Sequence, residues 1–87
     1  MKILAEPIDA LVIFRGRENP RPYKFRYSDR TFEVHEVKID KILQVDEIKT
    51  AGIRALVYRC QSEINGTYAL YELKYVIEDC RWELYKM

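Results

Sequence analysis

Residues that commonly perform covalent catalysis or bind metals are scarce in this chain. The sequence has one histidine, His35, and two cysteines, Cys60 and Cys80, with no Cys-x-x-Cys pair. A catalytic nucleophile needs a base oriented beside it, and structural zinc needs a tetrahedral set of cysteine and histidine ligands. We therefore predict no catalytic residue, no metal site and no cofactor. We expect Cys60 in the core, Cys80 partly buried beside the last turn, and no disulfide between them.

Carboxylates are frequent in the C-terminal part of the chain and could supply a general acid–base pair. The candidates are Glu63, Glu72, Glu78, Asp79 and Glu83. In the strand register that the hairpins predict, Glu72 and Glu83 each lie opposite a basic residue. We interpret these carboxylates as solvated strand charges. His35 has the same interpretation, as an exposed strand residue opposite Lys24.

Residues 15–30 form the one segment with a marked charge bias. Its only acids are Glu18 and Asp29, and its cations alternate with Tyr23, Phe25 and Tyr27. The cations are Arg15, Arg17, Arg21, Lys24, Arg26 and Arg30. Cations for phosphates and rings for bases are what a nucleic-acid groove uses. The competing interpretation, which we favour, is that alternation along a strand turns the rings into the core and the cations to water.

The elements that position these residues are strands, and the clearest signal is the turn Asn65-Gly66. Both residues tolerate the positive φ of a type I′ hairpin turn. Folding the chain back there pairs Cys60 with Tyr71 and Arg59 with Glu72, so that one face is apolar and the other polar. Strands over 53–64 and 67–77 follow.

Two further hairpins extend this pattern. A turn at Glu78-Asp79 pairs Tyr75 with Trp82, Leu73 with Leu84 and Lys74 with Glu83, which adds a strand over 80–86. A turn at Asp29-Arg30 pairs Tyr27 with Phe32, Phe25 with Val34 and Arg26 with Glu33. The predicted buried face of the C-terminal meander comprises Leu56, Tyr58, Cys60, Tyr71, Leu73, Tyr75, Trp82 and Leu84.

The remaining strands are less well defined by the sequence. Ile8 to Arg15 reads as a first strand, followed by a loop with Pro20 and Pro22. Residues 38–52 could be strand, loop or a short helix, and we favour a strand to about Val45 with a loop to Gly52. The fold class is therefore all-β: a small, strongly bent antiparallel sheet or partly open barrel of five to six strands, connected as a hairpin meander.

Length and composition indicate a single small domain over residues 1–87. Apolar residues make up 48% of the chain, which is typical of a folded protein, and the net charge is only +1. A strongly basic nucleic-acid binder is therefore not expected. The N-terminus lacks the apolar core of a signal peptide, and the longest apolar run, Ala10–Phe14, is too short to span a bilayer. We predict a cytoplasmic protein that does not bind membranes.

Several spaced residues resemble a group of small uncharacterised bacterial proteins. The matching strings are Pro20-x-x-Tyr23-x-Phe25-Arg26-x-x-x-Arg30-x-Phe32-x-Val34-x-x-Val37, Gly66-x-Tyr68-x-Leu70-Tyr71-Glu72-Leu73 and Trp82-x-Leu84. The resemblance covers residues 18–87. This sequence departs from the pattern of the group at Ser28-Asp29, where a glycine turn is expected, and at Ile42, where tryptophan is commoner. The resemblance implies a bacterial cytoplasmic β domain with no assigned activity and no catalytic residue.

These observations predict a non-enzymatic protein that works by binding or assembly. A protein partner or self-association is the favoured mode, because exposed strand edges and tyrosines can mediate a homodimer. The alternative is a weak nucleic-acid-binding protein that uses the cations of residues 15–30.

Overall fold

The computed structural model describes all residues, 1–87, as an all-β fold. Its strands are β1 (Ile3–Pro7), β2 (Asp9–Ile13), β3 (Arg21–Ser28), β4 (Val34–Lys38), β5 (Lys41–Thr50), β6 (Ile53–Ile64), β7 (Thr67–Val76) and β8 (Arg81–Lys86). They form a large antiparallel sheet in the order β1-β8-β7-β6-β5 and a small one in the order β2-β3-β4. No helix able to cross a membrane is present.

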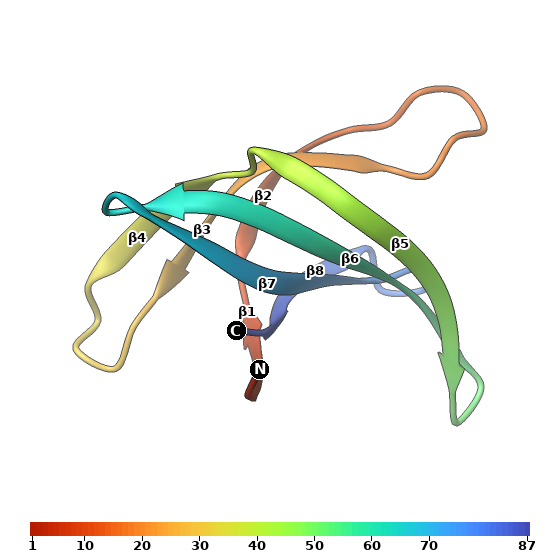
Figure 1. The fold of residues 1–87 in the computed structure, drawn as a ribbon. Helices are drawn as coiled ribbons and strands as arrows, with labels where there is room; N and C mark the ends of the chain where they lie inside the picture. Colours follow the sequence, from red (N-terminus) through yellow and green to blue (C-terminus); the bar gives the residue numbers. More distant parts are fainter.

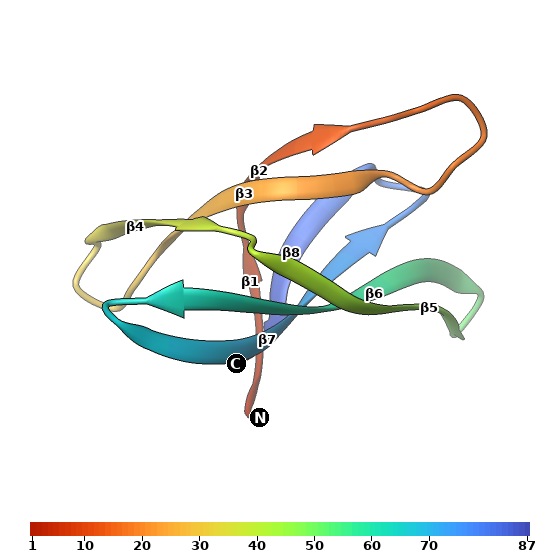
Figure 2. The same ribbon diagram turned by 45° about the horizontal axis from the view of Figure 1, so that its top comes forward.

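The large sheet is strongly bent (Figure 1). Figure 2 shows β2 and β3 on one side of the molecule and β6 and β7 on the other, with the chain crossing between the sheets from β4 to β5. The predicted all-β meander is confirmed, and the two sheets stay open rather than closing into a barrel. The strands number eight instead of five or six, because Ile3–Pro7 forms an additional strand and the chain passes from the small sheet to the large one at Ile39 and Asp40, which separates β4 from β5.

The β6–β7 and β7–β8 registers are as predicted. Cys60 pairs with Tyr71 and Arg59 with Glu72, while Tyr75 pairs with Trp82. The turn residues Asn65 and Gly66 both have positive φ, 51° and 79°, as a type I′ turn requires. Local turn chemistry and alternation therefore determine this half of the fold.

The core lies between the two sheets. All eight residues of the predicted buried face belong to one apolar cluster, which Phe25 and Val37 of the small sheet complete. Trp82 packs against two tyrosines of this cluster, with its ring centroid 4.8 Å from that of Tyr75 and 5.2 Å from that of Tyr58. The small sheet thus supplies the apolar cover that the bent large sheet needs.

The predicted register of the β3–β4 hairpin is wrong. Phe25 lies opposite Val37 and Arg26 opposite Glu36, rather than Val34 and Glu33. The cause is the loop: Asp29 accepts backbone hydrogen bonds from Thr31 and Glu33 through its side chain, which stabilises a wider turn than Asp29-Arg30 alone.

Two other boundaries also differ from the sequence prediction. Strand β5 continues to Thr50, since Ala51 and Gly52, with φ of 51° and 83°, form a tight turn into β6 where a longer loop was predicted. At the N-terminus, Ile3–Pro7 forms β1 on the free side of β8, and β2 ends at Ile13 rather than Arg15. The β1–β8 pairing joins the two ends of the chain, so no local sequence pattern predicts it.

The structure allows a test of the two predicted cross-strand charge pairs. Arg59 and Glu72 form an ion pair of 3.4 Å. Lys74 lies opposite Glu83, but its ammonium sits 4.9 Å from the ring centroid of Tyr85 instead. We expect double-mutant cycles on chemical denaturation to give a coupling energy of about 0.2–1 kcal/mol for Arg59–Glu72 and a smaller one for Lys74–Glu83. The reverse order would contradict these side-chain positions.

Candidate functional site

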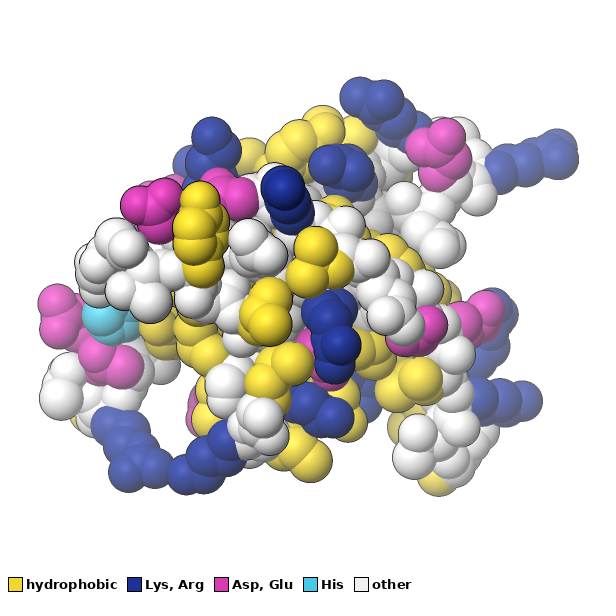
Figure 3. Space-filling view, viewed as in Figure 1, with side chains coloured by type: hydrophobic (Ala, Val, Ile, Leu, Met, Phe, Trp, Pro, Cys, Tyr) yellow, Lys and Arg dark blue, Asp and Glu magenta, His cyan; other side chains and the backbone are white.

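The cations predicted as a nucleic-acid site are all exposed but do not gather in one place. Arg15 and Arg17 lie in the loop between β2 and β3, Arg21 begins β3, and Arg30 lies in the loop at the other end of that strand. Lys and Arg side chains are scattered over the visible face, with acidic side chains among them (Figure 3). The sequence cluster is therefore not a continuous basic surface.

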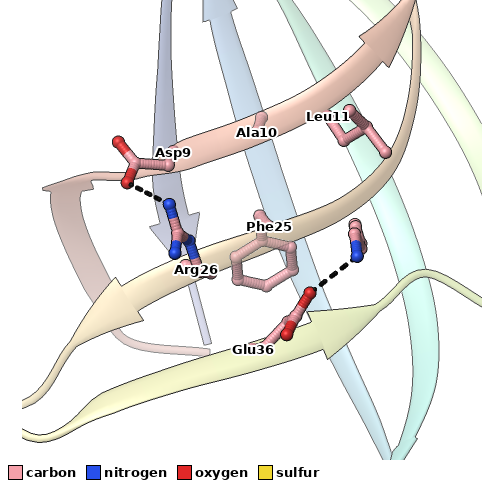
Figure 4. Close-up of a pocket in the computed structure, with 7 residues that line it drawn as sticks. Asp9, Ala10, Leu11, Phe25, Arg26 and Glu36 are labelled. Atoms are coloured by element: carbon pink, nitrogen blue, oxygen red, sulfur yellow. Dashed lines mark hydrogen bonds and ion pairs between the residues drawn. The ribbon is translucent and has the colours of Figure 1, made fainter.

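Two of these cations form ion pairs with carboxylates on the neighbouring strands. The Lys24 ammonium is 2.8 Å from the Glu36 carboxylate, and the Arg26 guanidinium is 3.3 Å from that of Asp9. Both pairs flank a shallow depression of about 290 Å³ over Phe25 on the outer face of the small sheet (Figure 4). Lys24 lowers the pKa of Glu36 from its usual value, mainly through its hydrogen bond. Neither cation is free to contact phosphate without breaking a pair.

The aromatic residues of this segment divide between core and surface. Phe25 is buried and Tyr27 is partly buried, as the favoured interpretation predicted. Tyr23 instead is exposed, with the Arg21 guanidinium 5.6 Å from its ring centroid. A β-bulge explains the difference, because the register between Leu11 and the next residue of β2 skips Tyr23. A row of bases stacked on three rings is therefore excluded.

His35 is not opposite Lys24, as the sequence suggested, but opposite Tyr27. Their rings stack with centroids 5.1 Å apart, and His35 Nε2 lies 2.7 Å from Asp29 Oδ2. The other oxygen of Asp29 accepts hydrogen bonds from the Thr31 hydroxyl and from two backbone N–H groups. The Thr31 hydroxyl and then His35 hold the pKa of Asp29 well below its usual range.

Asp29, Glu33 and His35 are the one group that could offer several metal ligands. One ligand atom from each lies within 4.8 Å of the others. Both oxygens of Asp29 already accept hydrogen bonds, and these bonds fix the β3–β4 loop. The closeness of these three side chains is therefore explained by the structure of the β3–β4 hairpin.

The thiols and remaining acids offer no catalytic grouping. Cys60 is fully buried, and desolvation raises the pKa of its thiol to about 12, so it is inert. Cys80 is exposed rather than partly buried as predicted, because it ends the turn before β8 with a positive φ of 50°. The carboxylate of Glu72 lies between Arg59 and Lys86, at 3.4 and 3.9 Å.

The structure also shows an exposed apolar surface that the sequence analysis did not predict, along β2 and the first residue of the loop after it. Leu11 and Ile13 are 58% and 39% exposed, and Phe14 is 64% exposed although its ring packs edge-on against Tyr75. Ala10 and Val12 alternate with Leu11 and Ile13 and pack against the core, so both faces of this short strand are apolar. The signal was present in the run Ala10–Phe14, since a strand with one solvated face normally alternates apolar with polar residues.

Comparisons with known proteins leave the function to be inferred from these surfaces. No protein-family model matches the chain, and no curated protein or solved structure is significantly similar to it. The bacterial origin and cytoplasmic location implied by the resemblance stay predictions.

The Asp29 network predicts a pH-dependent contribution to stability. Because the pKa of Asp29 is lowered from its ordinary value of 3.8, its hydrogen bonds stabilise the fold fully above that pH and less as the pH falls below it. We expect Asp29→Ala to lower the free energy of unfolding at neutral pH, and the difference from wild type to shrink in acid. Urea denaturation at about pH 7 and about pH 2.5 measures this.

Glu78→Gln is the control, because Glu78 takes part in no side-chain hydrogen bond or ion pair. A wild-type minus Asp29→Ala difference that stays constant across this pH range would show that the carboxylate is not engaged in the loop.

Proposed function

We propose that this protein is a non-catalytic protein-binding module, an accessory for binding or assembly, that docks an extended partner segment along the open edge of β2. The observation that carries the proposal is that β2, after its first residue Asp9, is an apolar edge strand without the features that usually block edges. Free Cys60 and Cys80 support placing this activity in a reducing, cytoplasmic compartment.

The four edge strands, β1, β2, β4 and β5, differ in how well they are protected. Proline, charged residues and bulges are the common means of blocking an edge. Strand β1 ends in Pro7 and has an irregular register before Glu6. Strand β4 has a charged side chain at Lys38, and β5 has Lys41 and a bulge at Leu43.

Strand β2 has none of these beyond its first residue. After Asp9 it consists of Ala10, Leu11, Val12 and Ile13, and the bulge in its ladder is on β3. Figure 2 shows β2 at the rim of the small sheet. An extended peptide added here would gain main-chain hydrogen bonds from the edge, and its alternate side chains would contact Leu11 and Ile13.

A peptide-display selection against the folded protein tests this proposal. We expect the selected peptides to be extended with alternating apolar residues, and their addition to perturb the NMR amide signals of residues 9–14. Leu11→Lys should weaken binding at least about tenfold, since an inserted charge blocks strand pairing. Leu70→Lys, at a 51% exposed position on β7, is the matched control and should bind normally. Equal binding by Leu11→Lys and wild type would refute the proposal.

Nucleic-acid binding is the alternative, and one observation favours it. Arg15, Arg17 and Arg21 lie at the same end of the small sheet as exposed Tyr23, and none of the three arginines has an acidic partner within 4.0 Å. Glu18 in the same loop reduces their field, so we expect only weak, salt-sensitive association with single strands.

Fluorescence anisotropy with labelled single-stranded DNA and RNA measures this association. We expect a dissociation constant weaker than about 1 µM near physiological salt. Replacing Arg15, Arg17 and Arg21 by alanine should flatten the salt dependence without unfolding the protein. Tighter binding that this triple variant abolishes would favour the alternative over the protein-binding module.

A further inference from the structure

We propose that the segment that occupies the β2 edge is β2 of a second copy of this chain. The two strands pair antiparallel about a two-fold axis at Val12, which joins the two small sheets into one continuous sheet. This inference rests on the proposed function, because it names the partner of the same edge.

The ladder on the other side of β2 indicates which backbone groups are available. A proline inside a central strand is tolerated where its nitrogen is not needed for a ladder hydrogen bond. Pro22 of β3 lies directly opposite Val12, which makes Val12 a non-hydrogen-bonded position toward β3. Residues at such positions turn their N–H and C=O groups away from the paired strand. Val12, and by alternation Ala10, therefore present their backbone groups to the open side.

Pairing about Val12 makes these groups mutual partners. Val12 lies opposite the partner's Val12 and can exchange two hydrogen bonds with it, which is the closed ring of a narrow antiparallel pair. Ala10 lies opposite the partner's Phe14. Phe14, 64% exposed in the single chain, would then be covered at the end of the interface.

The outer face is complementary in the same register. Leu11 lies opposite the partner's Ile13, so two exposed apolar side chains from each copy cover one another. Asp9 lies opposite the partner's Arg15. The Asp9 side chain is 78% exposed and shares only one of its oxygens with Arg26, which leaves the second oxygen free to accept from an arginine.

Neighbouring registers lose this complementarity. Because side chains alternate between the two faces of a strand, opposed side chains lie on the same face only if the two-fold axis passes through a residue. The alternative registers therefore have their axis at a neighbouring residue. An axis at Leu11 places Asp9 opposite the partner's Ile13, and an axis at Ile13 places Leu11 opposite the partner's Arg15. Each sets a charge against an apolar side chain and forfeits both interfacial ion pairs, so the axis at Val12 is selected.

A single short edge makes a small interface, at the low end of the range for specific complexes. We therefore expect a concentration-dependent equilibrium with a dissociation constant between about 1 µM and 1 mM. Light scattering over this concentration range should show the mean mass rising from that of the monomer toward that of the dimer. Leu11→Lys should stay monomeric, and Leu70→Lys should dimerise as wild type does. A wild-type chain that is monomeric throughout would overturn the inference.

Cross-linking tests the register, in a Cys80→Ser background that removes the exposed thiol. Leu11→Cys and Ile13→Cys proteins are prepared separately, then oxidised alone and as an equal mixture. The axis at Val12 predicts a disulfide dimer in the mixture and little in either protein alone, because Leu11 lies opposite the partner's Ile13. Cross-linking of Leu11→Cys alone indicates an axis at Leu11, and cross-linking of Ile13→Cys alone an axis at Ile13. Either result overturns the register proposed here.

The same proteins separate failure of this inference from failure of the proposed function. If wild type is monomeric but selected peptides still bind in a Leu11-dependent manner, the edge binds another protein and self-pairing is wrong. If the dimer forms but Leu11→Lys leaves it intact, the interface lies elsewhere and self-pairing at the β2 edge is wrong. The proposed function fails as well only if Leu11→Lys binds the selected peptides as wild type does.

Discussion

The buried hydroxyls of Tyr58 and Ser62 hold the small sheet over the large one, and the rest of the structure depends on these two hydrogen bonds. The Tyr58 hydroxyl donates to the carbonyl of Pro20, just before β3. The Tyr71 hydroxyl lies 2.6 Å from Ser62 Oγ, which donates to the carbonyl of Lys38 at the end of β4. A buried hydroxyl without a partner costs about 1–3 kcal/mol, so these bonds specify where the small sheet must lie. Burial also raises the pKa of Tyr58 to about 12, which keeps its donor protonated.

This constraint explains why the edge of the small sheet that lies away from the large sheet is β2. The hydroxyl bonds fix the beginning of β3 and the end of β4, on the side of the small sheet that adjoins the large one. Strand β2 is attached through its ladder with β3, through the Asp9–Arg26 ion pair, and through Ala10 and Val12, which pack against the core. Its outer edge has no neighbour. An apolar edge is a liability in a small protein unless something covers it, and that is the physical basis for assigning a partner to it.

The sequence predicts the elements whose geometry is set locally, and fails where a distant or unusual contact decides. Asn65-Gly66 fixes ten pairs of the β6–β7 ladder, because turn type and alternation both point to one register. The β3–β4 register fails since the side chain of Asp29, rather than a two-residue turn, shapes the loop. Strand β1 pairs with β8, and Lys2 exchanges backbone hydrogen bonds of 2.9 and 3.1 Å with Met87. Alternation within either end contains no information about that pairing.

The charge of the candidate site also could not be predicted from the sequence alone. Counted along the chain, residues 15–30 are basic. In space, Asp9 and Glu36 come from the strands on either side of β3 and pair with two of the cations, so net charge over a window overstates the field that a ligand meets. The sequence understates the apolar surface instead, because Leu11 and Ile13 look like ordinary core residues until the structure places them on the uncovered outer face of the small sheet. Such a surface becomes recognisable only when three observations are combined. The unbroken apolar run makes both faces of β2 apolar, the packing of the sheets leaves the Leu11 and Ile13 face uncovered, and the strand order leaves one edge of β2 open.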